Sequence, residues 1–199
     1  MEEILIATKN KGKAKDFEQL FAPFNIGVKT LLDMENAIDV EEDGTTFQEN
    51  AIKKAETIAR EFNIPTLADD SGLIVDALDG RPGVYSARYA GMNKDDQANL
   101  NKVLDELKNV PESKRSARFH CSLALALPGK KTVVVDGTCD GVITQEPIGD
   151  NGFGYDPIMF IPALDKTMAQ LSKQEKNEIS HRANALKHLK EILTMRQVF

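Results

Sequence analysis

The order of hydrophobic and polar positions predicts helices interspersed with strands from the first residues onward. An apolar run at residues 4–6 ends in a polar turn, and apolar side chains then recur at Ala14, Phe17, Leu20 and Phe21. Spacings of three and four place these four side chains on one face of a helix. The N-terminal segment is therefore expected to form a strand, a turn and an amphipathic helix.

Three further helical regions follow from the same spacing. One begins at the capping box of Thr46 and Glu49, a second covers about residues 95–108, and a third covers about residues 172–194 after a capping box at Ser172. The first has the core positions Phe47, Ala51, Ala55, Ile58, Ala59 and Phe62, with Lys53, Lys54 and Glu56 outside. The second is expected to bury Leu100, Val103, Leu104 and Leu107.

Strands are expected between these helices. Residues 119–127 alternate between apolar and smaller or polar side chains, a period of two that gives one core face. A turn at 128–131 leads into 132–136 as a hairpin, and 66–78 is expected to form strand, acidic turn and strand. Because hairpins occur among the alternating helices and strands, the pattern predicts an α/β fold with a mixed sheet flanked by helices.

Composition narrows the class of protein. The chain has 199 residues, enough for one domain or two small lobes that share a core, and we expect a single domain over 1–199. A net charge of −6 argues against a nucleic-acid polymer as partner. No segment reaches the roughly 18 apolar residues of a membrane span. Cys121 and Cys139 are expected to be packed free thiols in a reducing cytoplasm.

The turn after the first apolar run could bind an anion. It holds three lysines, an asparagine and a glycine directly before a helix, whose N-terminus favours negative charge. The alternative is an ordinary connection with solvated lysines. A Walker A loop is excluded, because the first glycine of that pattern is missing and Lys13 is followed by Ala14.

Two acidic clusters could supply metal ligands. Asp69 and Asp70 lie where a hydrophobic strand reaches Ser71 and Gly72, and a second cluster includes Glu41 and Glu42. Mg²⁺ takes one or two protein carboxylates and completes its shell with water and substrate phosphate. The alternatives are a capped β-turn for the first cluster and a solvated loop for the second.

Two segments near the C-terminus could contact a nucleoside. The glycine-rich turn at 149–157 carries Phe153 and Tyr155, which could stack on a base or instead fill the core. Lys176 and Arg182 would point about 120° apart on one continuous helix, so convergence requires long side chains or a break near Ser180. The alternative for these two residues and His181 is a solvated helix face. His120 is interpreted as structural and His188 as exposed helix surface.

Taken together, these segments resemble the inosine triphosphate pyrophosphatase family, the hydrolases of non-canonical purine nucleoside triphosphates. The matching segments, in the order of the family, are 8–13, 42–47 with 49–51, 69–73, 83–89, 152–157 and 179–182. The resemblance covers nearly the whole chain. It implies a strongly twisted mixed sheet with two lobes around a central cleft, and a homodimer.

The resemblance also implies the reaction and its residues: water attacks the α-phosphorus, and the monophosphate and pyrophosphate leave. It assigns the phosphates to Thr8, Lys9, Asn10, Lys11, Gly12 and Lys13. It assigns Mg²⁺ to Glu42 and Asp70, with Asp70 also as base, because alignment on Gly44 favours Glu42 over Glu41. It assigns a substrate contact to Ser71 and the nucleoside to Phe153, Gly154, Tyr155, Asp156, Lys176, His181 and Arg182.

Several alternatives stay open from sequence. Asp70 could take the proton itself or position a metal-bound water, with Asp69 sharing the work, and ITP, dITP and XTP are all candidate substrates. A Maf-like pyrophosphatase with different base contacts is the second enzyme hypothesis. A hypothesis of a different class is a nucleotide sensor without turnover. A pure phosphate binder, however, has no need of carboxylates beside anions.

Overall fold

The computed structural model describes residues 3–24 and 26–195 and confirms a mixed α/β fold. The helices are α1 (Lys11–Phe21), α2 (Phe47–Phe62), α3 (Asp96–Glu106), α4 (Lys173–Ile179) and α5 (His181–Met195). The strands are β1 (Glu3–Ile6), β2 (Gly27–Thr30), β3 (Thr66–Val75), β4 (Ser116–Ala126), β5 (Val133–Ile143), β6 (Met159–Ile161) and β7 (Lys166–Thr167). They form a seven-stranded sheet in the order β2-β1-β3-β4-β5-β6-β7. β1 pairs in parallel with β2 and β3, whereas β6 pairs antiparallel with β5 and β7.

The chain divides into two compact units, and strands β3, β4 and β5 contribute residues to both. Unit 1 comprises Met1–Asp70, Cys121–Gly137 and Arg182–Phe199, and unit 2 comprises Ser71–His120 and Thr138–His181. Each of the three apolar cores lies within one unit. No helix in the described part of the chain is long and apolar enough to cross a membrane.

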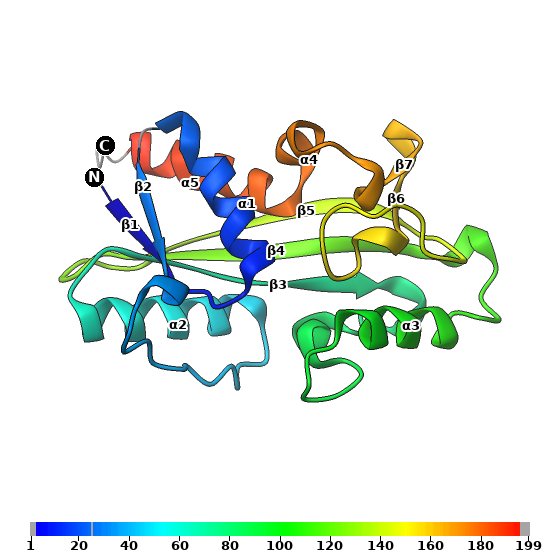
Figure 1. The fold of residues 1–199 in the computed structure, drawn as a ribbon, viewed down its shortest axis with the longest axis horizontal. Coiled ribbons are helices and arrows are strands. Elements are labelled where there is room, and N and C mark those ends of the chain that lie inside the picture. The colour runs from blue at the N-terminus through cyan, green and yellow to red at the C-terminus, as the bar shows by residue number, and fades with distance from the viewer. Residues whose placement is uncertain (1–2, 25, 196–199) are drawn as a thin grey trace. The chain divides into compact units, whose positions relative to one another are not determined.

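In unit 1, helices cover both faces of the sheet. α1 and α5 lie on one face, where Phe17 and Leu189 belong to a core with Leu123. α2 lies on the other face, where Ile58 packs with Ala124 (Figure 1). The prediction of a single core face for β4 was therefore wrong in this unit, because the small alanines on its second face leave room for α2.

The acidic turn predicted within 66–78 was also wrong. β3 runs without interruption for ten residues from Thr66 to Val75, through both aspartates and through Gly72. Gly72 has a packing role here, because a Cβ at this position would lie 2.5 Å from the carbonyl oxygen of Gly83. A strand that continues through Asp69 and Asp70 turns these two side chains to opposite faces.

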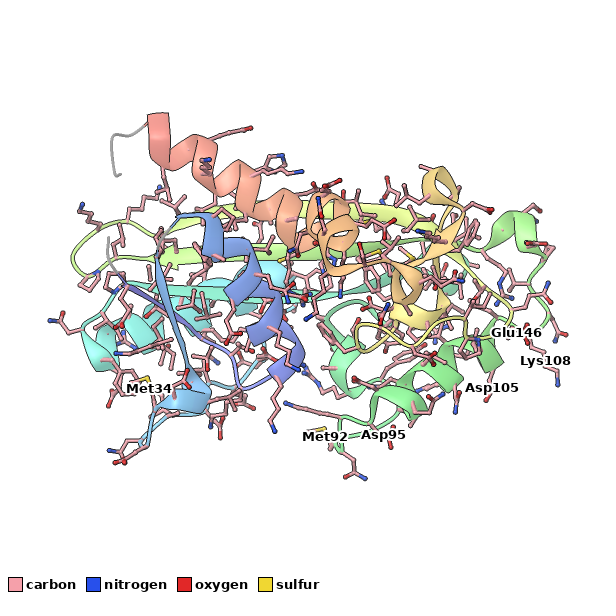
Figure 2. The ribbon with its side chains drawn as sticks, turned by 45° about the horizontal axis from the view of Figure 1, so that its top comes forward. Met34, Met92, Asp95, Asp105, Lys108 and Glu146 are labelled. Atoms are coloured by element: carbon pink, nitrogen blue, oxygen red, sulfur yellow. The ribbon has the colours of Figure 1, made fainter. Side chains whose placement is uncertain are left out.

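In unit 2, Leu100 and Val103 of α3 and Leu107 directly after it pack against the strands, as the apolar spacing predicted. Asp95 caps this helix by accepting the N–H of Ala98 at 2.9 Å. Figure 2 shows Asp95 at the start of α3 and Asp105 near its end, on the polar side of the helix. The predicted burial of Leu104 is only partial.

The predicted helix starts and the possible break near Ser180 are present. Thr46 and Ser172 both open helices with complete capping boxes. Ser180 is extended, with φ −63° and ψ 153°, and separates α4 from α5. The predicted third helical region is therefore two helices, which changes the directions of the side chains on either side of the break.

Candidate active site

The segment after β1 turns directly into the N-terminus of α1. Thr8 is buried, and its Oγ1 accepts the N–H of Asn10 at 3.1 Å. Asn10 then caps the helix by accepting the N–H of Lys13 at 3.0 Å. The first turn of α1 holds no acidic residue. The dipole of α1 and the lysines around its start therefore make this end of the helix electropositive.

The lysines of this segment point to different partners. Lys9 forms an ion pair at 2.7 Å with Asp39; the side chain of Asp39 is largely exposed and that of Lys9 about half exposed. Lys13 instead reaches Asp69, with Nζ 3.0 Å from Oδ2, and lies largely out of solvent. Lys13 is therefore the lysine that joins the start of α1 to the acidic residues of β3.

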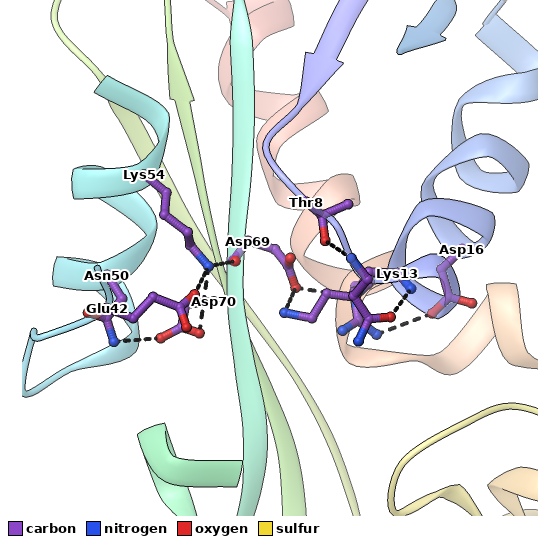
Figure 3. Close-up of polar contacts among 10 residues, drawn as sticks. Thr8, Lys13, Asp16, Glu42, Asn50, Lys54, Asp69 and Asp70 are labelled. Atoms are coloured by element: carbon purple, nitrogen blue, oxygen red, sulfur yellow. Dashed lines mark hydrogen bonds and ion pairs between the residues drawn. The ribbon is translucent and has the colours of Figure 1, made fainter. Parts of the chain in front are cut away.

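Asp69 is a fully buried carboxylate held between two cations. Besides Lys13, the Nε of Arg182 lies 3.3 Å from its Oδ2. Burial alone would raise the pKa of Asp69, but the charges of Lys13, Arg182 and Lys54 lower it well below the usual range of aspartate. Arg182 also contacts Asp16 on α1 at 3.2 Å. Asp69 is therefore ionised at neutral pH and orients the two cations. Figure 3 shows its ion pair with Lys13.

Asp70 faces the opposite side of β3, toward α2. Its Oδ2 accepts a hydrogen bond at 2.9 Å from the side-chain amide of Asn50, whose Oδ1 accepts the N–H of Gly44 at 2.8 Å. Burial raises the pKa of Asp70 more than Lys54 and Lys13 lower it, and the nearby charge of Glu42 raises it further. Asn50 thus ties the acidic loop to the strand, although the sequence analysis gave it no role.

Lys54 was predicted to face outward from α2, and this prediction was wrong. Its side chain is buried, and its ammonium contacts Glu42, the carbonyl oxygen of Asp69 at 2.6 Å and Oδ1 of Asp70 at 3.9 Å (Figure 3). Burial lowers the pKa of Lys54, but the charges of Asp70, Glu42 and Asp69 raise it above that of a free lysine. A buried lysine is stable here because carboxylates surround it.

The pair of Glu42 and Asp70 is the part of this site that could hold a metal ion. No group of three His, Cys, Asp or Glu side chains among the described residues could hold one by itself. A hard divalent cation needs only one or two protein carboxylates when water and phosphate complete its shell. Lys54 already places a cation against both carboxylates. The donor set therefore fits a hard divalent cation that arrives with a phosphate ligand.

In unit 2, a glycine-rich loop brings three of the predicted nucleoside residues together. Asp156 accepts the N–H of Phe153 at 3.0 Å and the ammonium of Lys176 at 2.8 Å. The same ammonium lies 5.0 Å from the centre of the Phe153 ring. Gly152 has φ +79° and its Cα lies against the carboxylate of Asp156, where a Cβ would collide. The loop therefore presents a half-buried ring beside a buried ion pair.

The other residues around this loop anchor it to unit 2. Tyr155 is buried, and its hydroxyl donates to the carbonyl oxygen of Ser86 at 2.7 Å, so this ring fills the core. The N–H of Gly154 donates to Asp96 on α3 at 3.0 Å. Phe153 is thus the loop aromatic that is left half-buried, and Asp96 is a further contact that the sequence analysis did not identify.

His181 and Arg182 are consecutive but have different surroundings. His181 is buried in unit 2 and stacks on Phe119, with 5.0 Å between the ring centres. Arg182 contacts Asp16 and Asp69 in unit 1. The extended Ser180 is what separates these directions from that of Lys176 on α4.

Comparison with known proteins identifies the family. A model of the Ham1 family matches residues 4–192. The chain belongs to the Ham1 family. Over 95% of its length it is 59% identical to the dITP/XTP pyrophosphatase of Halalkalibacterium halodurans, of which it covers 97%. A protein of the same name from Geobacillus kaustophilus is 57% identical, with 96% and 94% covered.

Solved structures of Ham1 proteins agree with this fold. The Ham1 protein of Staphylococcus aureus is 48% identical, with a TM-score of 0.85 over 98% of this chain and 99% of that one. A HAM1 protein from Coxiella burnetii is 43% identical, with a TM-score of 0.86 over 98% of this chain and all of the other. The mixed sheet and its flanking helices are therefore those of the family.

In this Ham1-family chain, most of the charged site residues were predicted from the sequence, but the residues that contact and orient them were not. Asn50, Lys54 and Asp16 all contact a predicted site residue and were given no role. One signal could have found the first two, since Asn50 and Lys54 lie four positions apart and share a helix face. No comparable signal marks Asp16, because its contact with Arg182 joins residues 166 positions apart.

Proposed function

We propose that this chain hydrolyses the non-canonical purine nucleoside triphosphates ITP, dITP and XTP to the monophosphate and pyrophosphate. The chain is a nucleoside-triphosphate pyrophosphatase, in line with the dITP/XTP pyrophosphatases to which it is similar. The observation that carries the proposal is the arrangement of charges on β3. Asp69 pairs with the cations Lys13 and Arg182 on one face of the strand. On the other face Asp70 lies with Asn50, Lys54 and Glu42.

The triphosphate is assigned to the start of α1. Thr8, Lys9, Asn10, Lys11, Gly12 and Lys13 would surround the phosphates with the ammonium groups of the three lysines and the positive end of the α1 dipole, and Lys13 carries the charge closest to Asp69. Fixed positive groups of this kind offset charge that develops on the leaving pyrophosphate. β1 ends at Ile6, which pairs with Leu67 of β3, so Asp69 lies just beyond the carboxyl end of β1. In α/β folds, ligands bind at the carboxyl ends of the strands.

Glu42 and Asp70 would hold Mg²⁺. When bound, Mg²⁺ supplies positive charge to the phosphate oxygens and so lowers the cost of breaking the anhydride bond. The cation-attracting position between the two carboxylates, held by Lys54, supports this assignment. Glu41 stays the second choice, because its side chain is exposed.

Asp70 is the proposed base. Water attacks the α-phosphorus, the bond to the oxygen that bridges the α- and β-phosphates breaks, and pyrophosphate leaves with that oxygen. The proton of the water passes to Asp70, whose raised pKa brings it nearer to neutral pH. Asp69 is unsuited to this task because Lys13 and Arg182 stabilise its ionised form. It is proposed to position those two cations.

Nucleoside recognition is assigned to unit 2 and to Arg182. Phe153 offers a ring face, the backbone of Phe153, Gly154, Tyr155 and Asp156 frames it, and Lys176 and His181 supply donors. Ser71, directly after Asp70, is proposed as a further substrate contact. A donor that bonds the 6-oxo group of hypoxanthine or xanthine is left unpaired by adenine, and such a site can discriminate by about 10⁴. Guanine shares the oxo group, so we expect its rejection to be weaker.

The cellular setting follows the same proposal. We infer that the protein acts in the cytoplasm as a homodimer, with residues 1–199 as one functional domain. Neither a nucleic-acid polymer nor a membrane is expected as partner, given the acidic net charge of −6.

A substrate panel tests the function. Wild-type protein with Mg²⁺ is given ITP, dITP, XTP, GTP or ATP, and released pyrophosphate is measured. We expect rapid release from the first three, slower release from GTP and very little from ATP. Absence of release from ITP and from XTP overturns the proposal. Tight triphosphate binding without release would indicate a sensor, and a preference for other bases would indicate a Maf-like enzyme.

A further inference from the structure

Lys54 places a positive charge within the pair of acidic side chains assigned to the metal. Its ammonium contacts Glu42, and it lies 3.9 Å from Oδ1 of Asp70. A third contact, at 2.6 Å, is to the carbonyl oxygen of Asp69. All three partners are oxygen atoms, and two belong to carboxylates. Oxygen atoms of this kind are the ligands that a hard divalent cation prefers.

The surroundings hold this ammonium firmly in its charged form. The side chain is 11% exposed, against 9% for Asp70 and 27% for Glu42, so the three groups interact with little screening by water. Removing the ammonium would leave two neighbouring carboxylates without a cation between them, which is costly at this depth. Lys54 therefore neutralises the acidic pair in the protein as it stands.

We propose that Lys54 is an internal counter-cation that competes with the divalent cation for Glu42 and Asp70. A divalent cation that binds both carboxylates must displace the ammonium from them, because two cations at one pair of carboxylates repel each other. The free protein consequently binds the ion weakly, and a nucleotide that carries the ion with it adds the ligands that tip the balance. This inference rests on the metal assignment within the proposed function.

The flexible four-carbon stem of lysine suits such an exchange. The ammonium is a compact point charge that can move while its Cα stays fixed in α2. Lys53, the next residue, provides a matched comparison: it forms an ion pair with Asp43 at 2.6 Å, and both of those side chains are about half exposed. Two adjacent lysines on one helix thus differ in whether they occupy the candidate metal position.

Binding of Mn²⁺ to the nucleotide-free protein tests the proposal directly. Calorimetric titration with Mn²⁺ compares wild type, Lys54→Met, Lys54→Arg and Lys53→Met, each checked by circular dichroism. We expect Lys54→Met to bind Mn²⁺ ~10-fold more tightly than wild type, because the competing charge is gone. Lys54→Arg keeps the charge and Lys53→Met lies outside the pair, so both should bind as wild type does. Unchanged or weaker binding by folded Lys54→Met, or no binding by any of the four, overturns the proposal.

A second measurement uses the wild-type chain alone and covers the case in which Lys54→Met does not fold. Reductive methylation of lysines is followed by mass spectrometry with and without Mg²⁺. We expect modification of Lys54 to rise when Mg²⁺ is present, while that of Lys53 stays constant. A Lys54 that Mg²⁺ leaves equally protected contradicts the exchange. Both readouts are independent of turnover, so failure of the substrate panel alone would reject the proposed reaction and leave this inference standing.

Discussion

Asp69 and Asp70 are neighbours in the chain, yet their carboxylates lie on opposite faces of β3. Asp69 meets Lys13 and Arg182, whereas Asp70 meets Asn50 and lies beside Lys54. The alternation of an extended strand is enough to separate them. One strand thereby gives two adjacent aspartates opposite shifts in pKa, lowered for Asp69 and raised for Asp70.

The first prediction concerns Asp70 as base. Asp70→Asn keeps the size of the side chain but removes the proton acceptor, so we expect kcat for ITP to fall by about 10²–10⁴. The melting temperature should change little, because an amide can still accept from Asn50. Asp43→Asn, an exposed acid of the neighbouring loop, is the control and should turn over normally. A kcat near that of wild type would reject the role of Asp70.

The second prediction concerns Lys13 as a phosphate contact. Lys13→Ala removes the first-turn lysine of α1 that pairs with Asp69, and we expect kcat/KM for ITP to fall by about 10–100-fold. Inhibition by inorganic tripolyphosphate, which has no base, should weaken by a similar factor. Lys15→Ala, on the exposed side of α1, serves as control. If KM and kcat/KM for ITP are unchanged in Lys13→Ala, the phosphate assignment is refuted.

The third prediction concerns Gly72 and the packing of unit 2. A Cβ at Gly72 would lie 2.5 Å from the carbonyl oxygen of Gly83 and would also collide with the hydroxyl of Ser86. We expect Gly72→Ala to lower the free energy of unfolding by about 1–3 kcal/mol, as overpacking usually does. Denaturant titration measures this loss.

A double variant separates the two contacts of Gly72. Ser86→Ala removes the contact with the hydroxyl, but it also removes the bonds of that hydroxyl to the N–H of Leu73 and the carbonyl oxygen of Gly83. The double variant is therefore compared with Ser86→Ala alone, and Gly72→Ala should still lower stability in that background because the backbone oxygen of Gly83 remains. No further loss in that background would show that the backbone approach of Gly83 contributes nothing to the requirement for glycine.

The fourth prediction concerns the acid side of the stability profile. The pKa of Asp69 is lower in the folded protein than the value of about 3.9 in an unfolded chain. Its ionised form therefore stabilises the fold above about pH 4, and this contribution is lost as pH falls toward the folded-state pKa. Asp69→Asn should show a shallower loss of melting temperature between about pH 4 and pH 2 than wild type or the exposed-site control Asp105→Asn. Identical slopes would contradict the charge assignment.

The parts of the fold that follow local rules could be predicted from sequence. Helical spacing located α2 and α3, and side-chain capping located the starts of α2 and α4. The possible break at Ser180 was also recognised from the geometry of Lys176 and Arg182. These features depend on residues only a few positions apart, and the sequence contains them directly.

The parts that failed depend on partners distant in the chain. Asp69, Asp70 and Gly72 resemble turn residues, but Gly72 is needed in a strand because Gly83 and Ser86 approach it. Lys54 resembles an exposed helix residue, but Glu42 and Asp70 make its burial favourable. In both cases a tertiary contact reverses a local preference, and no periodicity in the sequence records that contact.

The two hydrogen bonds of the Asn50 amide restrict which amino acids can replace it at position 50. Its nitrogen donates to Asp70 and its oxygen accepts from Gly44, so both ends of one small planar group are in use. Aspartate has nearly the same shape but offers no donor when ionised and would repel Asp70, while leucine offers neither function. Saturation mutagenesis of this buried position should therefore favour asparagine, because the side chain must offer a donor at one end and an acceptor at the other. Size alone would permit several residues.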